Sequence, residues 1–320
     1  MIRTAESVSP MHPDKICDRI SDAIVDAALK GDPKSRVAIE TMGGHGIVSL
    51  TGEITTESYV DIRKIVNRIA GDKVGVQTNI VRQSTEISQG VDTGGAGDQG
   101  IMVGYACSEN EAMIPQETYL SRSLCHFIYE EYPYDGKTQI TLDDKGKISA
   151  VVASFQNSES KALANLVEEW AKKNKLTLPK TGLHFNPAGD WNIGGFEADT
   201  GLTGRKLIVD NYGPRIPIGG GAFSGKDATK VDRSGAYMAR RVAVDLVRKN
   251  KAKEVYVYIA YAIGIVDPVM AIAIIDGKEE QIKGYDLSPR GITEFLGLDK
   301  PIFEKTAEWG HFGNGFVWDK

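Results

Sequence analysis

The feature that most limits how this chain can fold is a helix-strand-strand pattern that recurs along it. Residues 14–29 place isoleucines and alanines at helical spacing, and the turn Gly31-Asp32-Pro33 ends this predicted helix. Two strand-like runs follow, at residues 36–41 and 47–50. The order of the first copy is therefore helix, strand, strand.

The same order returns twice further along the chain. The copy near the end comprises a predicted helix and two predicted strands at residues 232–250, 255–262 and 269–275. The copy in the middle comprises a helix and two strands at residues 116–131, 139–142 and 148–155. We therefore predict an α+β fold of three similar modules, with boundaries at residues 1–92, 93–190 and 191–320.

Composition excludes several classes of protein. The 320 residues are 41% hydrophobic, enough for a sizeable core, and the net charge of −5 argues against a nucleic acid as the main partner. Three cysteines without metal-ligand spacing favour reduced thiols in the cytoplasm, and residues 1–13 have no apolar run typical of a signal peptide. The apolar stretch 255–275 is interrupted by Gly264 and Asp267-Pro268, so two core strands are expected there and no membrane helix.

Two glycine motifs match familiar nucleotide-binding patterns but lack their context. Residues 220–226 have the spacing of a P-loop, yet Asp227 stands where a hydroxyl residue should bind magnesium. Residues 95–100 read G-x-G-x-x-G, but a strand is expected after them where a Rossmann unit needs a helix. Both segments still indicate that the backbone approaches something closely there.

Cations gather beside these glycines. Three regions contain them: the first has Arg205 and Lys206, the second Lys226 and the third Lys230. Lys137, after Gly136, is a fourth candidate. Aspartates are interleaved with them. Arginine and lysine neutralise phosphate oxygens while carboxylates hold magnesium, so the pattern indicates a polyphosphate with bound metal.

Two aspartates stand at equivalent places in their modules. Asp14 and Asp232 both lie at the start of a long predicted helix, and each is surrounded by basic residues. One interpretation is an acidic helix cap, and the other is a metal ligand. His12, two residues before Asp14, is a catalytic candidate on the strength of these neighbours.

With these motifs the chain resembles the S-adenosylmethionine synthetase family. The resemblance rests on motifs that span the chain in the family's order: His12-Pro13-Asp14-Lys15, Gly95 to Gly100, Gly201-Leu202-Thr203-Gly204-Arg205-Lys206, Gly219 to Asp227 and Gly310-His311-Phe312-Gly313. It implies three α+β modules about a pseudo-threefold axis, in agreement with the repeat. It also implies homodimers or homotetramers whose active sites are shared between subunits.

The resemblance further implies that methionine sulfur attacks C5′ of ATP, and that the triphosphate is then hydrolysed to phosphate and pyrophosphate. The residues implied in catalysis are His12, Lys137, Arg205 and Lys226. ATP and its phosphates would be held by these residues together with Trp191, Asp199, Lys206 and Lys230. The implied methionine-binding residues are Glu53, Gln89, Asp98 and Lys230. Two Mg²⁺ per site would bind at Asp14 and Asp232, and K⁺ near Glu40.

Two other classes remain open on the residues alone. A kinase or ligase could use the same phosphate cluster without alkylating sulfur, and a silent nucleotide-binding subunit could bind ATP without turnover. Detection of a methionine-dependent adenosyl sulfonium product separates the first from a synthetase. The sequence also departs from the family's usual pattern at Ser9-Pro10-Met11 and Gln156-Asn157.

A third departure generates a prediction about gating. Only Thr93 and Gly94 separate Asp92 from the motif 95–100, several residues fewer than the family usually has. Because lid closure excludes water and commits the substrate, we predict looser discrimination between methionine and its ethyl homologue. The penalty for ethionine should be smaller than the ~1–3 kcal/mol that one methylene can be worth.

The measurement compares kcat/KM for methionine and ethionine in this protein and in a variant with a full-length loop graft. The triphosphate to pyrophosphate ratio is measured alongside, because a weaker gate should release some triphosphate before hydrolysis. A graft that changes neither quantity would contradict the prediction.

Overall fold

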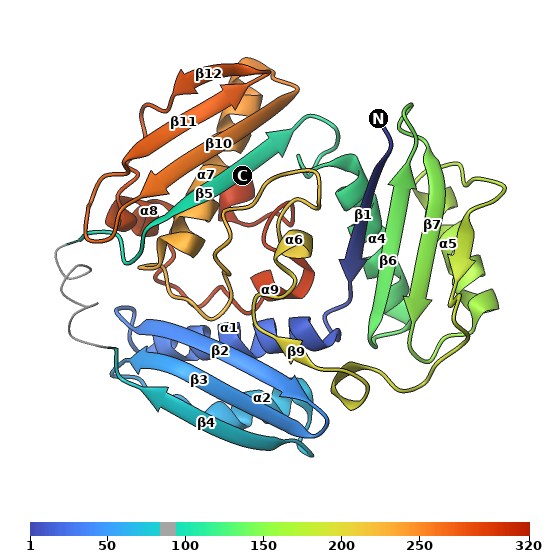
Figure 1. Cartoon of the computed structure of the whole chain (residues 1–320), viewed down its shortest axis with the longest axis horizontal. Coiled ribbons are helices and arrows are strands. Elements are labelled where there is room, and N and C mark those ends of the chain that lie inside the picture. The colour runs from blue at the N-terminus through green and yellow to red at the C-terminus, as the bar shows by residue number, and fades with distance from the viewer. Residues whose placement is uncertain (84–93) are drawn as a thin grey trace.

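The computed structural model describes residues 1–83 and 94–320, which form three four-stranded sheets with helices packed on them (Figure 1). The first repeat comprises α1 (Pro13–Gly31), β2 (Arg36–Gly44), β3 (Ile47–Thr55), α2 (Ile62–Ala70) and β4 (Gly75–Val81). The second comprises α4 (Gln116–Glu131), β6 (Gly136–Leu142), β7 (Ile148–Phe155), α5 (Ser160–Lys173) and β8 (Leu183–Phe185). The third comprises α7 (Val231–Asn250), β10 (Glu254–Tyr261), β11 (Met270–Ile275), β12 (Lys278–Gln281) and α8 (Pro289–Leu296).

The predicted α+β class and the helix-strand-strand order of all three modules are confirmed. The predicted helix 116–131 and strand 148–155 have the bounds of α4 and β7. The apolar stretch 255–275 forms β10 and β11, and no described helix is long and apolar enough to cross a membrane. Residues 95–100 lead into a strand, β5 (Gly100–Cys107), as predicted. The predictions for Gln89 and for residues 92–93 lie outside the described residues.

Each sheet takes one strand from another part of the chain, which the sequence did not reveal. β1 (Arg3–Val8) pairs with β6 in the second repeat's sheet, and β5 pairs with β10 in the third repeat's sheet. The short β9 (Gly201–Leu202) pairs with β2 in the first repeat's sheet. The three modules are thus linked in a ring of exchanged strands, with α6 (Leu207–Asp210) and α9 (Thr306–Trp309) between the sheets (Figure 1).

The last strand pair is parallel in two of the sheets and antiparallel in the third, and the length of the connection between the paired strands explains this difference. In the first two, a helix connects the hairpin to the last strand, and the last pair, β3 with β4 or β7 with β8, is parallel. In the third, β11 and β12 are joined by the tight turn at Asp276-Gly277 and are antiparallel. A two-residue turn can only join antiparallel strands, whereas a helical crossover permits a parallel pair.

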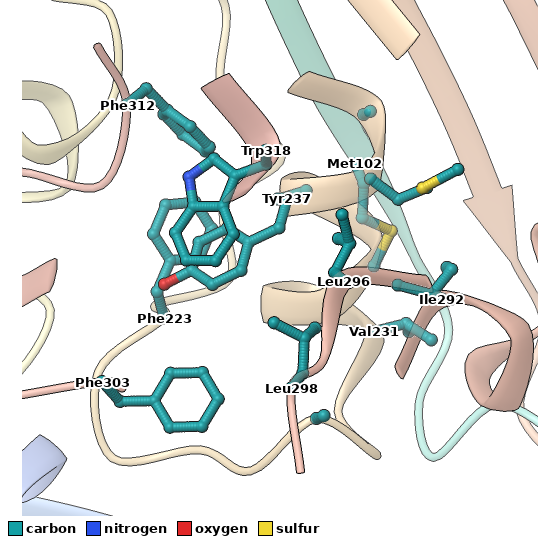
Figure 2. Close-up of a cluster of buried hydrophobic side chains, with 14 of the residues drawn as sticks. Met102, Phe223, Val231, Tyr237, Ile292, Leu296, Leu298, Phe303, Phe312 and Trp318 are labelled. Carbon is teal, nitrogen blue, oxygen red and sulfur yellow. The ribbon is translucent and has the colours of Figure 1, made fainter. Parts of the chain in front are cut away.

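One large core joins the first and third repeats, and a smaller core lies within the second. Aromatic side chains from the end of the chain complete the large core against α7 (Figure 2). Trp318 stacks on Tyr237 with ring centroids 3.7 Å apart, and Phe312 stacks on Tyr212 at 4.6 Å. The three cysteines, Cys17, Cys107 and Cys125, are buried free thiols.

A buried ion pair connects α1 to α7 inside this core. Arg233 Nη1 and Nη2 donate to the two Asp22 carboxylate oxygens at 2.6 and 2.9 Å, and both side chains are fully buried. Asp22 also accepts the Gly225 backbone N–H at 2.9 Å, and Arg233 donates to the Lys226 carbonyl at 2.9 Å. The pair therefore fixes the segment that carries Lys226.

Removal of one partner should be costly because the other charge would remain buried and unpaired. We expect Arg233→Met to lower the free energy of unfolding by about 3–5 kcal/mol. Arg290→Met serves as a control, since Arg290 and its partner Glu294 are largely exposed, and it should leave the urea midpoint unchanged. Both variants should be measured at one protein concentration, and equal midpoints for the two would contradict the prediction.

Candidate active site

The first turn of α1 positions His12 and Asp14. His12 is the N-cap residue, Pro13 occupies the first helical position, and the His12 Nδ1 accepts the Asp14 backbone N–H at 3.2 Å. Proline suits that position because its missing N–H would have no partner there. The His12 side chain, not the Asp14 carboxylate, thus caps the helix.

The surroundings of His12 keep its ring neutral. Burial, followed by the positive charges of Lys206 and Lys137, lowers the pKa of His12 to about 3, against the opposing charges of Asp14 and Asp199. Because Nδ1 accepts a hydrogen bond, the single ring proton of the neutral tautomer resides on Nε2. His12 is therefore a hydrogen-bond donor through Nε2.

Asp14 is buried among cations at the same helix start. It accepts the Leu202 backbone N–H at 2.9 Å, and Lys206 Nζ lies 2.5 Å and Arg205 Nε 3.4 Å from its oxygens. Burial alone would raise the pKa of Asp14, but the hydrogen bonds from Lys206 and Leu202 outweigh it and the net shift is downward. We call His12, Asp14, Lys137, Asp199, Arg205 and Lys206 the α1 cluster.

A second cluster forms at the start of α7. Lys226 Nζ donates to the Asp232 carboxylate at 2.7 Å, and Lys230 Nζ donates to Asp227 at 2.5 Å. Glu40 of β2 lies within reach of the Lys226 charge, which opposes the rise in pKa that partial burial gives the Glu40 carboxyl. We call Glu40, Lys226, Asp227, Lys230 and Asp232 the α7 cluster.

Asp14 and Asp232 hold the same helical position. Each is the second residue of its helix, after Pro13 in α1 and after Val231 in α7, and neither is the N-cap residue. The capping interpretation of the sequence is therefore wrong for both. Each instead forms an ion pair with a lysine, and each carboxylate offers hard oxygen ligands of the kind that magnesium prefers.

Glycines let the backbone pass close to both aspartates. A Cβ on Gly201 would come within 2.2 Å of the Pro13 backbone, and a Cβ on Gly221 would come within 2.2 Å of the Asp232 carboxyl carbon. Both distances are below any real contact, so these glycine motifs are explained by close approach. The segment 220–226 has neither a strand before it nor the P-loop geometry, in agreement with the sequence analysis.

Asp135 is a site residue that sequence reasoning missed. Its carboxylate accepts the Gly195 backbone N–H at 3.0 Å, and it interacts through charge with Lys137 and Asp199 of the α1 cluster. Burial raises its pKa. Together with Met11 and Gln156 it lines a cavity of about 490 Å³. Its place two residues before Lys137, at the start of a strand, was the available signal.

Of the remaining predicted residues, Trp191 lies beside the α1 cluster, because its partner Ser154 pairs with Lys137 across β6 and β7. Trp191 Nε1 donates to Ser154 Oγ at 3.2 Å, and its ring packs at Gly194 beside Gln156. Glu53 lies on β3, and Asp98 precedes β5, whose Gly100 is close to Asp232. No three of the described His, Cys, Asp and Glu side chains converge as a ready metal site.

Comparison with known proteins covers nearly the whole chain. Models of the S-adenosylmethionine synthetase N-terminal, central and C-terminal domains match residues 1–92, 93–191 and 193–320. The S-adenosylmethionine synthase of Pelagibacter ubique is 41% identical across 99% of this chain and 95% of its own length. The Treponema denticola enzyme is 42% identical across 99% of this chain and 95% of its own length. The Myxococcus xanthus enzyme is 41% identical and is covered over 92% of its length.

These alignments run over 363 to 371 positions, more than the 320 residues of the chain. The relatives therefore carry segments that this chain lacks.

The neutral state of His12 predicts a pH dependence of stability. The unfolded chain binds a proton at this residue below about pH 6.5, while the folded chain does so only near pH 3. The unfolded state thus binds more protons between these values, so the His12 contribution to stability rises with pH across that window and is lost as pH falls.

The stability difference between the protein and its His12→Gln variant should therefore shrink by about 1.4 kcal/mol per pH unit below pH 6. Urea unfolding of both proteins at pH 4.5, 5.5 and 7 measures this difference. Titrating groups that do not interact with His12 are common to both proteins and cancel. A difference that does not change with pH would contradict a neutral buried His12.

Proposed function

The chain belongs to the S-adenosylmethionine synthetase family, and from that premise we propose how its residues synthesise S-adenosylmethionine from ATP and L-methionine. The observation that carries the proposal is the matched position of Asp14 and Asp232, each ion-paired to a lysine at the second residue of a long helix. The family match favours this reaction over the kinase or ligase and the silent subunit considered from the sequence.

In the first step a lone pair of the methionine sulfur forms a bond to C5′ of ATP, and the C5′–oxygen bond breaks. The electron pair of that bond leaves with the triphosphate, and the sulfur becomes a sulfonium. A thioether is a weak nucleophile, so alignment with C5′ has to supply much of the rate, an effect worth roughly 7–11 kcal/mol. His12 donates its Nε2 proton as a hydrogen bond to the departing oxygen, a role that needs no charge on the ring.

The cations of both clusters bind the phosphate chain. Lys206 and Arg205 surround Asp14, Lys137 acts on His12 through charge, and Lys226 and Lys230 stand before α7. Negative charge develops on the leaving triphosphate, and fixed cations in a water-poor site stabilise it. The same residues then hold the triphosphate while water hydrolyses it to phosphate and pyrophosphate.

Asp14 and Asp232 would each hold a magnesium ion, since their carboxylates fit its preference for oxygen ligands. When bound, the ions neutralise phosphate charge and orient the chain of phosphates. The lysines that pair with these carboxylates would then be free to contact phosphate oxygens. Glu40, on the exposed side of β2 near Lys226, is the proposed K⁺ residue.

The substrate-binding residues are proposed on the family's pattern. Trp191 and Asp199 would contact the nucleoside, with Asp135 added from its contacts with Gly195 and Lys137. Glu53, Gln89, Asp98 and Lys230 would contact methionine. Reduced buried thiols support a cytoplasmic enzyme.

We propose that each active site is completed by a second copy of the chain. No hydrogen bond or ion pair within residues 1–83 and 94–320 joins the α1 cluster to the α7 cluster, which is expected if they serve different sites. The sheets of the first and third repeats also expose large apolar side chains on or beside their strands, including Met42, Ile47, Ile101 and Val269. Apolar surface of this extent is typical of subunit interfaces, in a homodimer or a homotetramer.

Asparagine at either aspartate should abolish most turnover and leave the fold intact. Asp14→Asn and Asp232→Asn each remove a carboxylate ligand, and neither residue caps its helix. Mass-spectrometric detection of the sulfonium product measures turnover, and thermal unfolding checks the fold. Normal turnover with a large loss of stability would favour a purely structural role.

His12→Asn should slow adenosyl transfer more than hydrolysis of added triphosphate, because its hydrogen bond goes to the oxygen that leaves C5′. Single-turnover assays of the two steps test this expectation. Equal losses in both steps would contradict the assigned role.

Mixing two inactive variants tests the shared site. In a dimer of His12→Asn and Asp98→Asn chains, one of the two sites would contain both native residues. Random subunit exchange should then restore about a quarter of the wild-type activity. Absence of rescue despite proven exchange would show that each chain builds its own site.

A further inference from the structure

A cavity of about 550 Å³ lies between α4 and the segment that contains α9, and none of the residues assigned above to the reaction lines it. Its walls carry three aromatic side chains, Tyr119, Trp309 and Phe316. Trp309 is held in place by Tyr129 and His126, whose ring centroids lie 5.4 and 4.7 Å from its own. A cavity of this size with rigid aromatic walls suits a small organic ligand. We call it the α4–α9 pocket.

The pocket contains a buried cation without a carboxylate partner. The Arg122 residue is 7% exposed, and within residues 1–83 and 94–320 its guanidinium forms no ion pair. It donates to three backbone carbonyls, those of Phe312, Val209 and Asn211, and the last two bonds are long at 3.3 and 3.4 Å. Burial lowers the pKa of Arg122 to about 10, although the charges of Asp210 and Asp319, which make no direct contact with the guanidinium, oppose this shift. An arginine fork in this state is well suited to receive a carboxylate.

The charge of the lining favours a monoanion. Besides Arg122, the ionised groups on the pocket wall are Lys305 and Glu308, and neither forms an ion pair among the described residues. With Arg122 included, the net charge of the pocket lining is +1. His126, another lining residue with a half-exposed side chain, has its Nδ1 3.5 Å from a Glu130 carboxylate oxygen on the same helix.

Arg122 also connects the pocket to the α1 cluster. The two long bonds from its Nη2 end on carbonyls at either side of Asp210, the last residue of α6. Asp210 is ion-paired with Lys15 of α1, and the N-cap residue of α6 is Lys206, which donates to Asp14. The short helix α6 therefore has the pocket's arginine at one end and the phosphate-binding lysine at the other.

We propose that the α4–α9 pocket binds a small aromatic carboxylate, with the carboxylate on Arg122 and the ring among Tyr119, Trp309 and Phe316. A bound carboxylate competes for Nη2 and weakens its bonds to Val209 and Asn211, which loosens α6 and the Lys206 that it carries. The ligand thus raises KM for ATP. This second part rests on the proposed function, whereas binding itself does not.

The test uses 2-naphthoate as the probe and its neutral isostere 2-naphthamide as the matched control, with the intact enzyme in a calorimeter. We expect saturable binding of one naphthoate per chain, at least tenfold tighter than the amide, and unchanged when ATP and magnesium are present at saturation. KM for ATP should rise at least about fivefold at saturating naphthoate, the lower end of measured couplings between sites.

Two variants separate a lost contact from a lost fold. Arg122→Gln should reduce naphthoate affinity to that of the amide. Lys305→Glu changes an exposed side chain, so the fold and basal turnover should persist while naphthoate binding weakens about tenfold and amide binding does not.

Four results would overturn the site: no saturable binding, equal affinity for acid and amide, displacement of the probe by ATP, or no effect of Lys305→Glu. Binding that leaves KM for ATP unchanged would overturn the coupling through α6. Because calorimetry needs no turnover, failure to form S-adenosylmethionine would refute the proposed function without touching the site.

Discussion

The arrangement of this molecule depends on one ion pair, between Asp22 of α1 and Arg233 of α7. Both helices begin at a cluster of charged residues, and the pair joins the first turn of α7 to a point about two and a half turns into α1. The loop before α7 is held by the same two side chains, through the Gly225 N–H and the Lys226 carbonyl. A buried pair of this kind adds little net stability compared with apolar packing, but removal of either partner leaves a buried charge. Its effect is therefore to specify one relative position of the two helix starts.

The exchanged strands also fix how the three repeats are joined to one another. Because β1, β5 and β9 each pair in a sheet that another repeat builds, no repeat has its complete sheet from its own stretch of chain. β9 is only two residues long, yet it places Gly201 against the first turn of α1 and delivers the Leu202 N–H to Asp14. The segment that follows carries Arg205 and Lys206 to the same carboxylate. The pairing of β9 with β2 thus both closes the ring of modules and assembles the α1 cluster.

The sequence predicted the parts of this structure that depend on local chemistry. Helical and strand periodicity located α1, α4, α7 and their hairpins, and glycine-flanked cations located both clusters. It could not predict the strand exchange, because pairing of β1 with β6 joins residues 129 to 139 positions apart and has no local pattern. It also missed Asp135, since one carboxylate at a strand start resembles any turn residue until Gly195 is seen to donate to it. The capping interpretation of Asp14 failed because His12 occupies the cap, an uncommon choice that composition rules do not favour.

The neutrality of His12 explains how its cluster can serve a reaction that separates charge. In the proposed mechanism Asp14 must stay available to a cation, and a protonated histidine beside it would compete for the same oxygens. Burial, Lys206 and Lys137 remove that competition by holding the pKa of His12 far below neutral pH. The same lysines are the ones proposed to attract the phosphate chain, so the groups that keep the ring neutral would also bring the leaving oxygen to it. In that proposal, a neutral N–H would stabilise the developing negative charge without adding a positive charge that binds the substrate and the transition state equally.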